Sequence, residues 1–369
     1  MKIHVLSILF VFLLATVVVA QDEATEVFDL ASLASKQSYT APPAEANVAT
    51  ESNWLASAQQ LAAAEETAAK EEPAAAKTPP SQPPAAAEKG PPLPFHTIEG
   101  YGGGAITPMA YLVNPGPKGS WFGLPAAAFS NVIMGRKNLQ ALTITETLFG
   151  RIELGYGLDR FGVGTLDNDI RRATGVDIDH DAVWLHNFNV RGLLVEENSF
   201  GLPLPALTGG VHFKVNDGIS SINNKLGGAL SSIGYEKANG VDFTLTASKT
   251  FVDKIFTLNR PLILTAGLRN SSAAQLGFLG FSDHRSTTFE GSVAYLPTDW
   301  LLVAYEFRGK ANPYDRIPGL VGDENNWQAI DVSWIINKHA TLVAGWGDFG
   351  NMANTVEDGA WWLQFKYEF

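Results

Sequence analysis

The sequence predicts an all-β protein, a transmembrane antiparallel β-barrel of about 12 strands, with about 14 as the alternative. Three observations lead to this prediction. After about residue 98 the apolar residues recur with a period of two, and the connections between these segments are alternately short and long. The chain also ends on a strongly alternating aromatic segment, WWLQFKYEF. Counted back from this end, the predicted strands begin near residue 126.

The first 97 residues differ in composition from the rest of the chain. An apolar run follows Lys2 and ends in small residues before Gln21, so residues 1–20 resemble a secretory signal peptide, with a retained membrane anchor as the alternative. Residues 21–97 are rich in Ala, Glu and Pro, which predicts a largely disordered periplasmic tether with a helix over 53–70. The barrel is predicted to span residues 98–369.

Composition excludes several classes of protein. The chain has 369 residues, no cysteine and a formal net charge of -12, without any dense run of Lys and Arg. It therefore forms no disulfide, and we expect no nucleic-acid partner. Neither G-x-S-x-G nor H-E-x-x-H occurs, so we expect neither an enzyme nor a cofactor. A barrel hydrolase, with a triad assembled from separate strands, is the disfavoured alternative.

Strand alternation separates a lipid face from a lumen face. In RIELGYGLD, which covers residues 151–159, the apolar side chains point one way while charged residues and glycines point the other. The same rule, applied along the chain, assigns His186 and His212 to the lumen as polar residues. It also predicts a set of charged lumen residues that would control selectivity: Arg151, Glu153, Asp159, Arg191, Lys214, Asp242, Arg269, Glu290, Glu306, Arg308, Asp331 and Lys366.

These lumen charges permit two interpretations. Opposed rows of charge would set a transverse field that sorts solutes in a diffusion channel. Alternatively, the charges neutralise one another and fill a closed interior, as in narrow barrels. The sequence leaves the choice open. It also leaves open whether the glycine-rich segment 99–117 forms a further strand or folds inward as a plug.

Aromatic residues mark the expected membrane boundaries. An interfacial girdle is predicted from Tyr295, Trp300, Tyr305, Trp327, Trp334, Trp346 and Trp361. At the C-terminus, one face of the last strand resembles the terminal signal that the barrel-assembly machinery reads in outer-membrane proteins. The residues of this signal are Leu363, Phe365, Tyr367 and Phe369. A periplasmic C-terminus would place the long loops outside the cell.

An acidic loop contains weak candidates for metal binding. Asp177, Asp179 and Asp181 supply the hard oxygen ligands that suit Ca²⁺, but their spacing matches no complete calcium-loop motif. A solvated acidic loop is therefore favoured over a divalent site or a bridge to lipopolysaccharide. No metal site is predicted with these residues.

Two segments carry a family resemblance. GGGAITPMAYLVNPGP and NLQALTITETLFGRIELGYGLDRF, together with the aromatic C-terminus, resemble an uncharacterised family of bacterial proteins, a domain of unknown function predicted to form outer-membrane β-barrels. The resemblance covers about residues 98–369. The GAITPMA piece is also faintly similar to the start of barrels associated with exopolysaccharide export. The resemblance implies the fold and the location but transfers no catalytic residues.

These observations predict a porin-like barrel in the outer membrane of a Gram-negative-type bacterium. Its expected role is a passive pore or surface-polymer export component for small polar or saccharide solutes. The alternative is a non-conducting structural or adhesion barrel that anchors the envelope through its tether. Expected partners are outer-membrane lipid and lipopolysaccharide, the barrel-assembly machinery and, through the tether, the cell wall.

Overall fold

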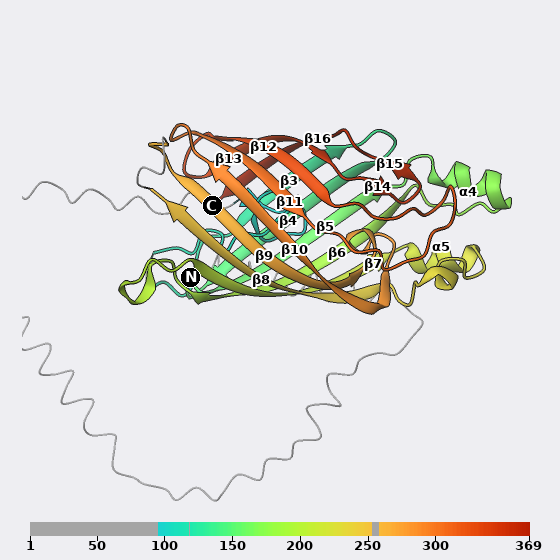
Figure 1. Cartoon of the computed structure of the whole chain (residues 1–369), viewed down its shortest axis with the longest axis horizontal. Helices are drawn as coiled ribbons and strands as arrows, with labels where there is room; N and C mark the ends of the chain where they lie inside the picture. Colours follow the sequence, from blue (N-terminus) through green and yellow to red (C-terminus); the bar gives the residue numbers. More distant parts are fainter. Residues whose placement is uncertain (1–94, 118, 253–257) are drawn as a thin grey trace, which may run out of the picture. The chain divides into compact units, whose positions relative to one another are not determined.

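The computed structural model describes residues 95–369, apart from 118 and 253–257, and shows a closed β-barrel (Figure 1). The predicted signal peptide (1–20) and all but the last residues of the predicted tether (21–97) lie outside the described residues. The wall has twelve strands: β3 (Ala126–Ile133), β4 (Asn138–Leu148), β5 (Ile152–Gly162), β6 (Ala182–Val195), β7 (Ala206–Asp217), β8 (Asn239–Phe251), β9 (Leu262–Ala273), β10 (Phe281–Tyr295), β11 (Leu301–Arg308), β12 (Trp327–Ile335), β13 (Ala340–Asp348) and β16 (Ala360–Glu368).

Pairing of the last strand with the first closes the sheet. Each wall strand is antiparallel to its neighbours, and β16 pairs with β3 so that Phe365 lies opposite Phe129. A closed sheet leaves no unpaired edge, which is the condition for strands to cross a bilayer. The prediction of about 12 strands is confirmed. The alternative of 14 is wrong, because residues 99–117 add no strand to the wall.

The two ends of the barrel differ in their connections. Residue 369 lies at the turn end, where the connections include the short segments 149–151 and 336–339. The opposite end, the loop end, carries longer segments (Figure 1). Their elements are α4 (Leu166–Thr174), α5 (Ile219–Lys225), η2 (Ser231–Ile233), η3 (Gln275–Gly277), β14 (Asn351–Met352) and β15 (Thr355–Val356). No helix in the described part of the chain is both long and apolar enough to cross a bilayer.

The outer face of the wall is apolar, as the alternation predicts. Exposed large apolar side chains lie on every wall strand, and Trp300, Trp334 and Trp361 are more than half exposed. Two individual predictions are wrong. Trp327 points inward, is 2% exposed and lies with its ring centroid 4.8 Å from that of Phe349. His186 belongs to the outward-facing set of β6, where its Nδ1 lies 2.8 Å from the Tyr156 hydroxyl.

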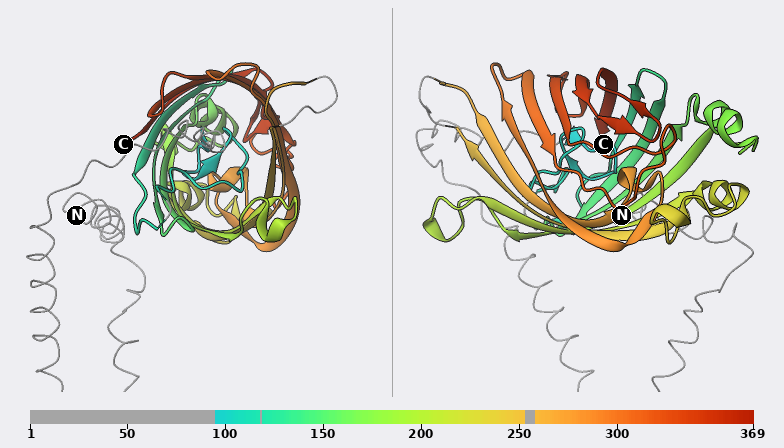
Figure 2. Two further views of the ribbon diagram at one scale, coloured as in Figure 1. Left: turned by 90° about the vertical axis from the view of Figure 1, so that its left-hand side faces the viewer. Right: turned by 45° about the vertical axis from the view of Figure 1, so that its right-hand side comes forward.

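Residues 95–113 fold inward as a plug. The segment contains a two-stranded hairpin of β1 (Phe95–His96) and β2 (Gly102–Gly103), and every one of its residues is buried. Figure 2 shows it inside the ring of wall strands when the barrel is viewed along its length. Of the two arrangements that the sequence allowed for the glycine-rich segment, the structure shows the plug.

Glycines on β5 create the space against which the plug lies. Gly155 and Gly157 face inward, and Gly100 of the plug has a positive φ of +87°. A Cβ atom at position 155 would lie 2.1 Å from the carbonyl oxygen of Gly100, and one at 157 would lie 2.7 Å from that of Glu99. The bare inner face of this strand therefore allows backbone-to-backbone contact that any larger side chain would prevent.

A methyl group at Gly155 should therefore displace the plug. We expect Gly155→Ala to lower the free energy of unfolding by about 1–3 kcal/mol, the usual cost of overpacking. Gly192→Ala is the matched control, because a Cβ at position 192 meets nothing within 4 Å. The measurement is the urea concentration at the midpoint of unfolding of each variant, monitored by tryptophan fluorescence. Equal midpoints for the two variants would contradict this docking of the plug.

Candidate functional site

The predicted lumen charges lie on the inner face of the wall, with one exception. Glu153, Asp159, Arg191, Lys214, Asp242, Arg269, Glu290, Glu306, Arg308, Asp331 and Lys366 are all buried. Arg151 does not join them, so its assignment to the lumen is corrected. It lies in the exposed connection before β5 and forms an ion pair of 2.6 Å with Glu196. The alternation rule fails there because Arg151 precedes the first residue of the strand.

Glu99 of the plug lies at the centre of the charged interior. One carboxylate oxygen is 2.5 Å from the Lys214 ammonium, and the other is 2.5 Å from the Arg308 guanidinium. The hydroxyl group of Tyr101 donates a hydrogen bond of 2.6 Å to the same carboxylate. These donors come from β7, β11 and the plug itself, so a single plug carboxylate connects well-separated parts of the wall.

Wall residues complete the network around Glu99. Lys214 also pairs with Asp242 at 2.9 Å, and Arg269 pairs with Glu290 at 2.9 Å and with Asp242 at 3.3 Å. Arg269 additionally donates to the Tyr101 hydroxyl at 2.7 Å. Each of the three cations in this network thus has a carboxylate partner. Since buried charge is costly without a partner, removal of Glu99 would leave the surrounding cations undercompensated.

Two wall carboxylates bind the backbone of the plug. Glu306 accepts hydrogen bonds from the amides of Ala105 at 2.6 Å and Thr107 at 2.7 Å, and a third from the Thr107 hydroxyl at 2.5 Å. Glu153 accepts from the amides of Gly102 at 3.1 Å and Val113 at 2.8 Å. Hydrogen bonds to a charged acceptor are the stronger kind, so these glutamates are the main polar attachment points of the plug.

Wall donors bind the plug carbonyls in return. Arg191 pairs with Glu153 at 3.0 Å and donates to the carbonyl groups of Gly102 and Met109. Asn189 donates to the carbonyl of Glu99 at 2.7 Å and is itself 2.7 Å from His212. His212 is buried on the inner face, where the sequence placed it. The plug backbone therefore replaces the water that a polar lumen would otherwise hold.

The remaining charged residues have local partners. Asp159 accepts from Asn187 at 2.8 Å, Asp331 accepts from the indole of Trp362 at 3.0 Å, and Lys366 pairs with Glu368 at 2.5 Å. In this conformation Glu99, Glu153, Asp242, Glu290 and Glu368 form ion pairs, and the plug fills the space between the charged side chains. Asp159, Glu306 and Asp331 are held by hydrogen bonds from uncharged groups. Of the two interpretations of these charges, the filled interior describes the conformation observed, with neutralisation around Glu99 but not along the whole wall.

Sequence reasoning did not assign Glu99 and Tyr101 to the site. A signal was nevertheless present, because Glu99 is the single charged residue between positions 97 and 117. A lone carboxylate in an otherwise uncharged segment, followed by wall strands that carry inward-facing cations, indicates an internal counter-ion. Its partners lie on strands more than a hundred residues away, so only the closed barrel brings them together.

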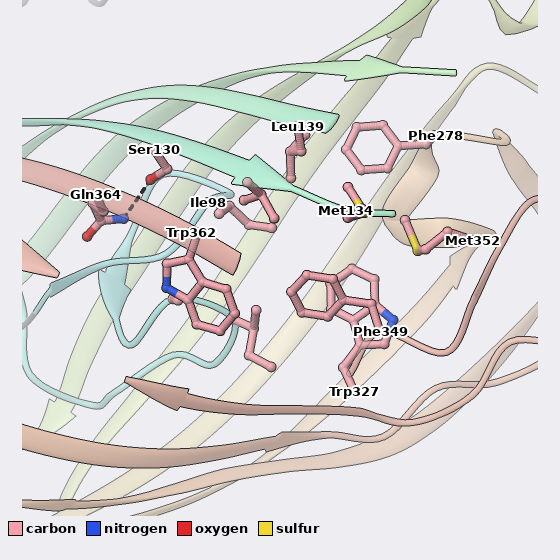
Figure 3. A pocket seen from close by; sticks show the side chains of 13 residues that line it. Ile98, Ser130, Met134, Leu139, Phe278, Trp327, Phe349, Met352, Trp362 and Gln364 are labelled. Atoms are coloured by element: carbon pink, nitrogen blue, oxygen red, sulfur yellow. Dashed lines mark hydrogen bonds between the residues drawn. The ribbon is translucent and has the colours of Figure 1, made fainter. Parts of the chain in front are cut away.

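Beyond the plug, apolar side chains of the wall and the loops gather toward the loop end. Figure 3 shows a small pocket there, bounded by Ile98 of the plug, Trp362 and Trp327 of the wall, and Phe349 and Met352 of the loops. Gln364 donates to the Ser130 hydroxyl at 2.8 Å beside it. The free volume is about 20 Å³, so little more than one water molecule would fit. Side chains therefore fill most of the space directly above the plug at this pocket.

The acidic loop does not assemble a cation site in this structure. Asp177 pairs with Arg171 at 2.6 Å, Asp181 with Arg160 at 2.6 Å, and Asp179 lies 3.8 Å from Lys225. Each carboxylate thus has its own basic partner. No group of three or more His, Cys, Asp or Glu residues is placed to hold a metal ion in the part of the chain that the structure describes.

Lys137 ties the β3–β4 connection to the loop before β16. Its ammonium group donates to Asn354 at 2.9 Å and to Thr355, and it lies 3.8 Å from the Glu357 carboxylate. Burial lowers the pKa of Lys137 to about 8, and Glu357 offsets only part of this effect. A buried cation at the loop end therefore contributes to a pH-dependent contact between the loops.

The chain matches a family described as protein of unknown function (DUF3034) over residues 94–366. It belongs to this family. The match confirms the resemblance drawn from the sequence and covers the plug and almost the whole barrel. No curated protein matches the chain.

Solved structures of other barrels are similar to the chain in fold. The KdgM porin is 11% identical with a TM-score of 0.41, over 66% of this chain and 99% of the other. The NanC porin is 9% identical with a TM-score of 0.39, over 66% and 100%. Omp33 of Acinetobacter baumannii is 7% identical with a TM-score of 0.36, over 68% and 99%.

The closed strand topology and the apolar outer face agree on one location. This chain closes its sheet and exposes apolar side chains around the wall, which is the arrangement of outer-membrane barrels. We conclude that the protein is a transmembrane β-barrel of the outer membrane. Which end of the barrel faces the periplasm remains a prediction from the C-terminal strand.

Loss of the Glu306 charge should loosen the plug. In Glu306→Gln one of the two acceptor oxygens is replaced by an amide nitrogen, and the hydrogen bonds to the remaining oxygen are no longer charge-assisted, so we expect a loss of about 1.5–3 kcal/mol in the stability of the bound plug. The readout is amide hydrogen exchange at Ala105 and Thr107, which should accelerate by about tenfold or more. Glu196→Gln, on an exposed glutamate, is the control. Unchanged exchange in the Glu306 variant would show that this carboxylate does not hold the plug.

The free energy of unfolding should rise with pH because the buried Lys137 loses its proton more readily in the folded state than in the unfolded chain. An unfolded lysine has a pKa of about 10.4, so between pH 8 and 10 the unfolded chain binds more protons than the folded one, and stability rises with pH. The difference between the two pKa values corresponds to a gain of roughly 3 kcal/mol in the free energy of unfolding once the pH has passed both of them. Urea midpoints at pH 7.5 and 10 would measure this rise. Lys137→Met should lack this component, and an identical pH dependence in both proteins would contradict the assignment.

Proposed function

We propose that the protein is a plugged outer-membrane channel for small polar or saccharide solutes, which is closed in the conformation described and opens when residues 95–113 are displaced. The observation that carries this proposal is the polar inner wall behind the plug. Buried ion pairs are commonly no more stabilising than apolar residues of similar volume. A barrel that only needed to be filled would gain little from so many enclosed charges.

The way in which the plug is held supports displacement. The charged residues Glu153 and Glu306 bind its backbone amides, and Arg191 binds its carbonyls. Water or a hydroxyl-rich solute offers the same hydrogen-bonding groups, so the plug can be replaced without leaving the wall unpaired. The passive pore expected from the sequence thus becomes a pore with an internal, exchangeable occupant. Wall residues such as Arg191, Arg269 and Arg308 would then face the passing solute and set selectivity.

A structural or adhesion barrel is the competing proposal. It is favoured by the buried plug and by the small free volume of the pocket beside it, which leave little space at this level of the interior. Under this proposal, the predicted periplasmic tether would anchor the envelope to the cell wall. Association with lipopolysaccharide and recognition of the last strand by the barrel-assembly machinery belong to either proposal, because both require a barrel inserted in the outer membrane.

A reversible lock on the plug separates the two proposals. The amide of Ala110 donates to the Ser248 hydroxyl at 2.9 Å, so the plug backbone at residue 110 lies beside the side chain of residue 248, and this pair of positions is chosen for a disulfide bond. The chain has no cysteine of its own, so Ala110→Cys with Ser248→Cys introduces a single pair. Single-channel conductance in planar bilayers is the measurement, with Glu306→Gln as the background that loosens the plug.

We expect Glu306→Gln to open about ten times more often than the unmodified chain, since 1.4 kcal/mol is a tenfold change in an equilibrium. The oxidised disulfide should abolish these openings and a reducing agent should restore them. Glu196→Gln should behave as the unmodified chain does. A folded barrel that stays silent in Glu306→Gln, with the lock reduced, would reject the channel and favour the structural barrel.

A further inference from the structure

The connecting segments at the loop end enclose a second cavity, larger than the pocket beside the plug. It measures about 190 Å³ and lies between α4, α5, the end of β5 and the segments around residues 278 and 320. The side chains that enclose it include Phe161, Ile170, Ile222, Phe278 and Leu320. Surface connections are usually polar and solvated, so an apolar chamber built from them requires an explanation.

The sequence of these segments is patterned to build the chamber. In α4, Leu166 and Ile170 are one turn apart and buried, while Asp167 and Arg171 lie on the outer side and pair at 3.2 Å. In α5 the buried Ile219 and Ile222 are likewise spaced for one face of a helix. Both helices therefore direct their apolar faces toward the same cavity, and their side chains leave it unfilled.

The lining determines what the cavity can hold. Thr174 is the single lining residue with a polar side chain, and no charged residue takes part. A water molecule needs two to four polar partners, which this lining does not offer. Protein interiors are packed to a density that leaves few voids larger than water, so an empty apolar chamber of this size is costly. An apolar ligand would remove that cost.

Size and shape limit the ligand further. An engineered apolar cavity of about 150 Å³ in another protein accepts benzene, so 190 Å³ accommodates one aromatic ring or a short alkyl chain. Phe161 and Phe278 stack with ring centroids 4.7 Å apart and an interplanar angle of 19°, which gives one side of the cavity a flat aromatic surface. Both rings are fully buried, so the surface is preformed.

An entrance is visible in the exposure of the lining residues. Phe161, Ile170 and Ile222 are buried, whereas Thr174 is exposed and Leu226 and Leu320 are half-buried. These last three come from α4, from the residue after α5 and from the segment around residue 320. The cavity therefore opens toward the solvent at the loop end, between these three elements.

We propose that this cavity is a binding site for a small uncharged apolar molecule, of the size of a substituted benzene or a short alkyl chain. The site is separate from the charged network around Glu99. It does not depend on whether the barrel conducts, because a ligand reaches it from the loop end without passing the plug.

The test uses fluorobenzene and the full-length protein folded in lipid nanodiscs. Binding is followed by ¹⁹F NMR as a saturable change in linewidth, relative to empty nanodiscs that report partition into lipid. Ala229→Phe and Leu320→Trp fill the cavity from its half-buried rim. Ala173→Phe is the matched control, because Ala173 is exposed on α4 and does not line the cavity. Resistance of each barrel to unfolding in cold SDS shows that the variants are folded.

We expect saturable binding in the unmodified chain and in Ala173→Phe, and at least a tenfold weaker affinity in the two filled variants. A charged analogue, benzylammonium, should not bind at this site. Absence of a saturable component in the unmodified chain would overturn the proposal. So would saturable binding that survives both filling substitutions, because the probe would then occupy another place. Neither result would affect the conductance test of the plug.

Discussion

Closure of the sheet by the pairing of β16 with β3 imposes the constraint on which the rest of the structure depends. In a bilayer every backbone amide and carbonyl needs a partner within the protein, and a closed antiparallel barrel satisfies this need without an edge. Closure also divides the side chains strictly into those facing lipid and those facing the interior, since successive residues alternate. Each charged residue on the inner face is thereby enclosed and needs a partner there.

The plug supplies those partners from a part of the chain outside the wall. Glu99 compensates Lys214 and Arg308, and the amides of the segment from Ala105 to Thr107 surround the Glu306 carboxylate. Gly155 and Gly157 allow the plug backbone to approach the wall. Charge, hydrogen bonding and steric space are therefore matched where the plug meets the wall, which explains how a short segment with little secondary structure is buried along its whole length.

The loop end is held together by apolar packing, whereas the plug is held by charges and hydrogen bonds. There the inward faces of α4 and α5 are apolar, and Phe161 and Phe278 continue the apolar surface toward the top of the plug. Contacts such as that of Lys137 with Asn354 hold the loops against one another. The interior thus changes from ionic at the plug to apolar at the loop end, so the two regions favour different ligands.

Local alternation was sufficient to predict the barrel, its strand number and the inward position of residues such as Glu153, Lys214 and Arg308, because a period of two fixes the side of the sheet on which a residue lies. The same rule failed at strand ends and in β6: Arg151 precedes its strand, Trp327 points inward at the first position of β12, and His186 faces outward. A periodic pattern does not give strand boundaries, and a shift of one residue reverses the side. Only the tertiary structure decided three features: the place of Glu99, the partners of the lumen charges and the cavity between the loops. Each of them depends on contacts between residues that are far apart in sequence. Closure of the barrel brings those residues together.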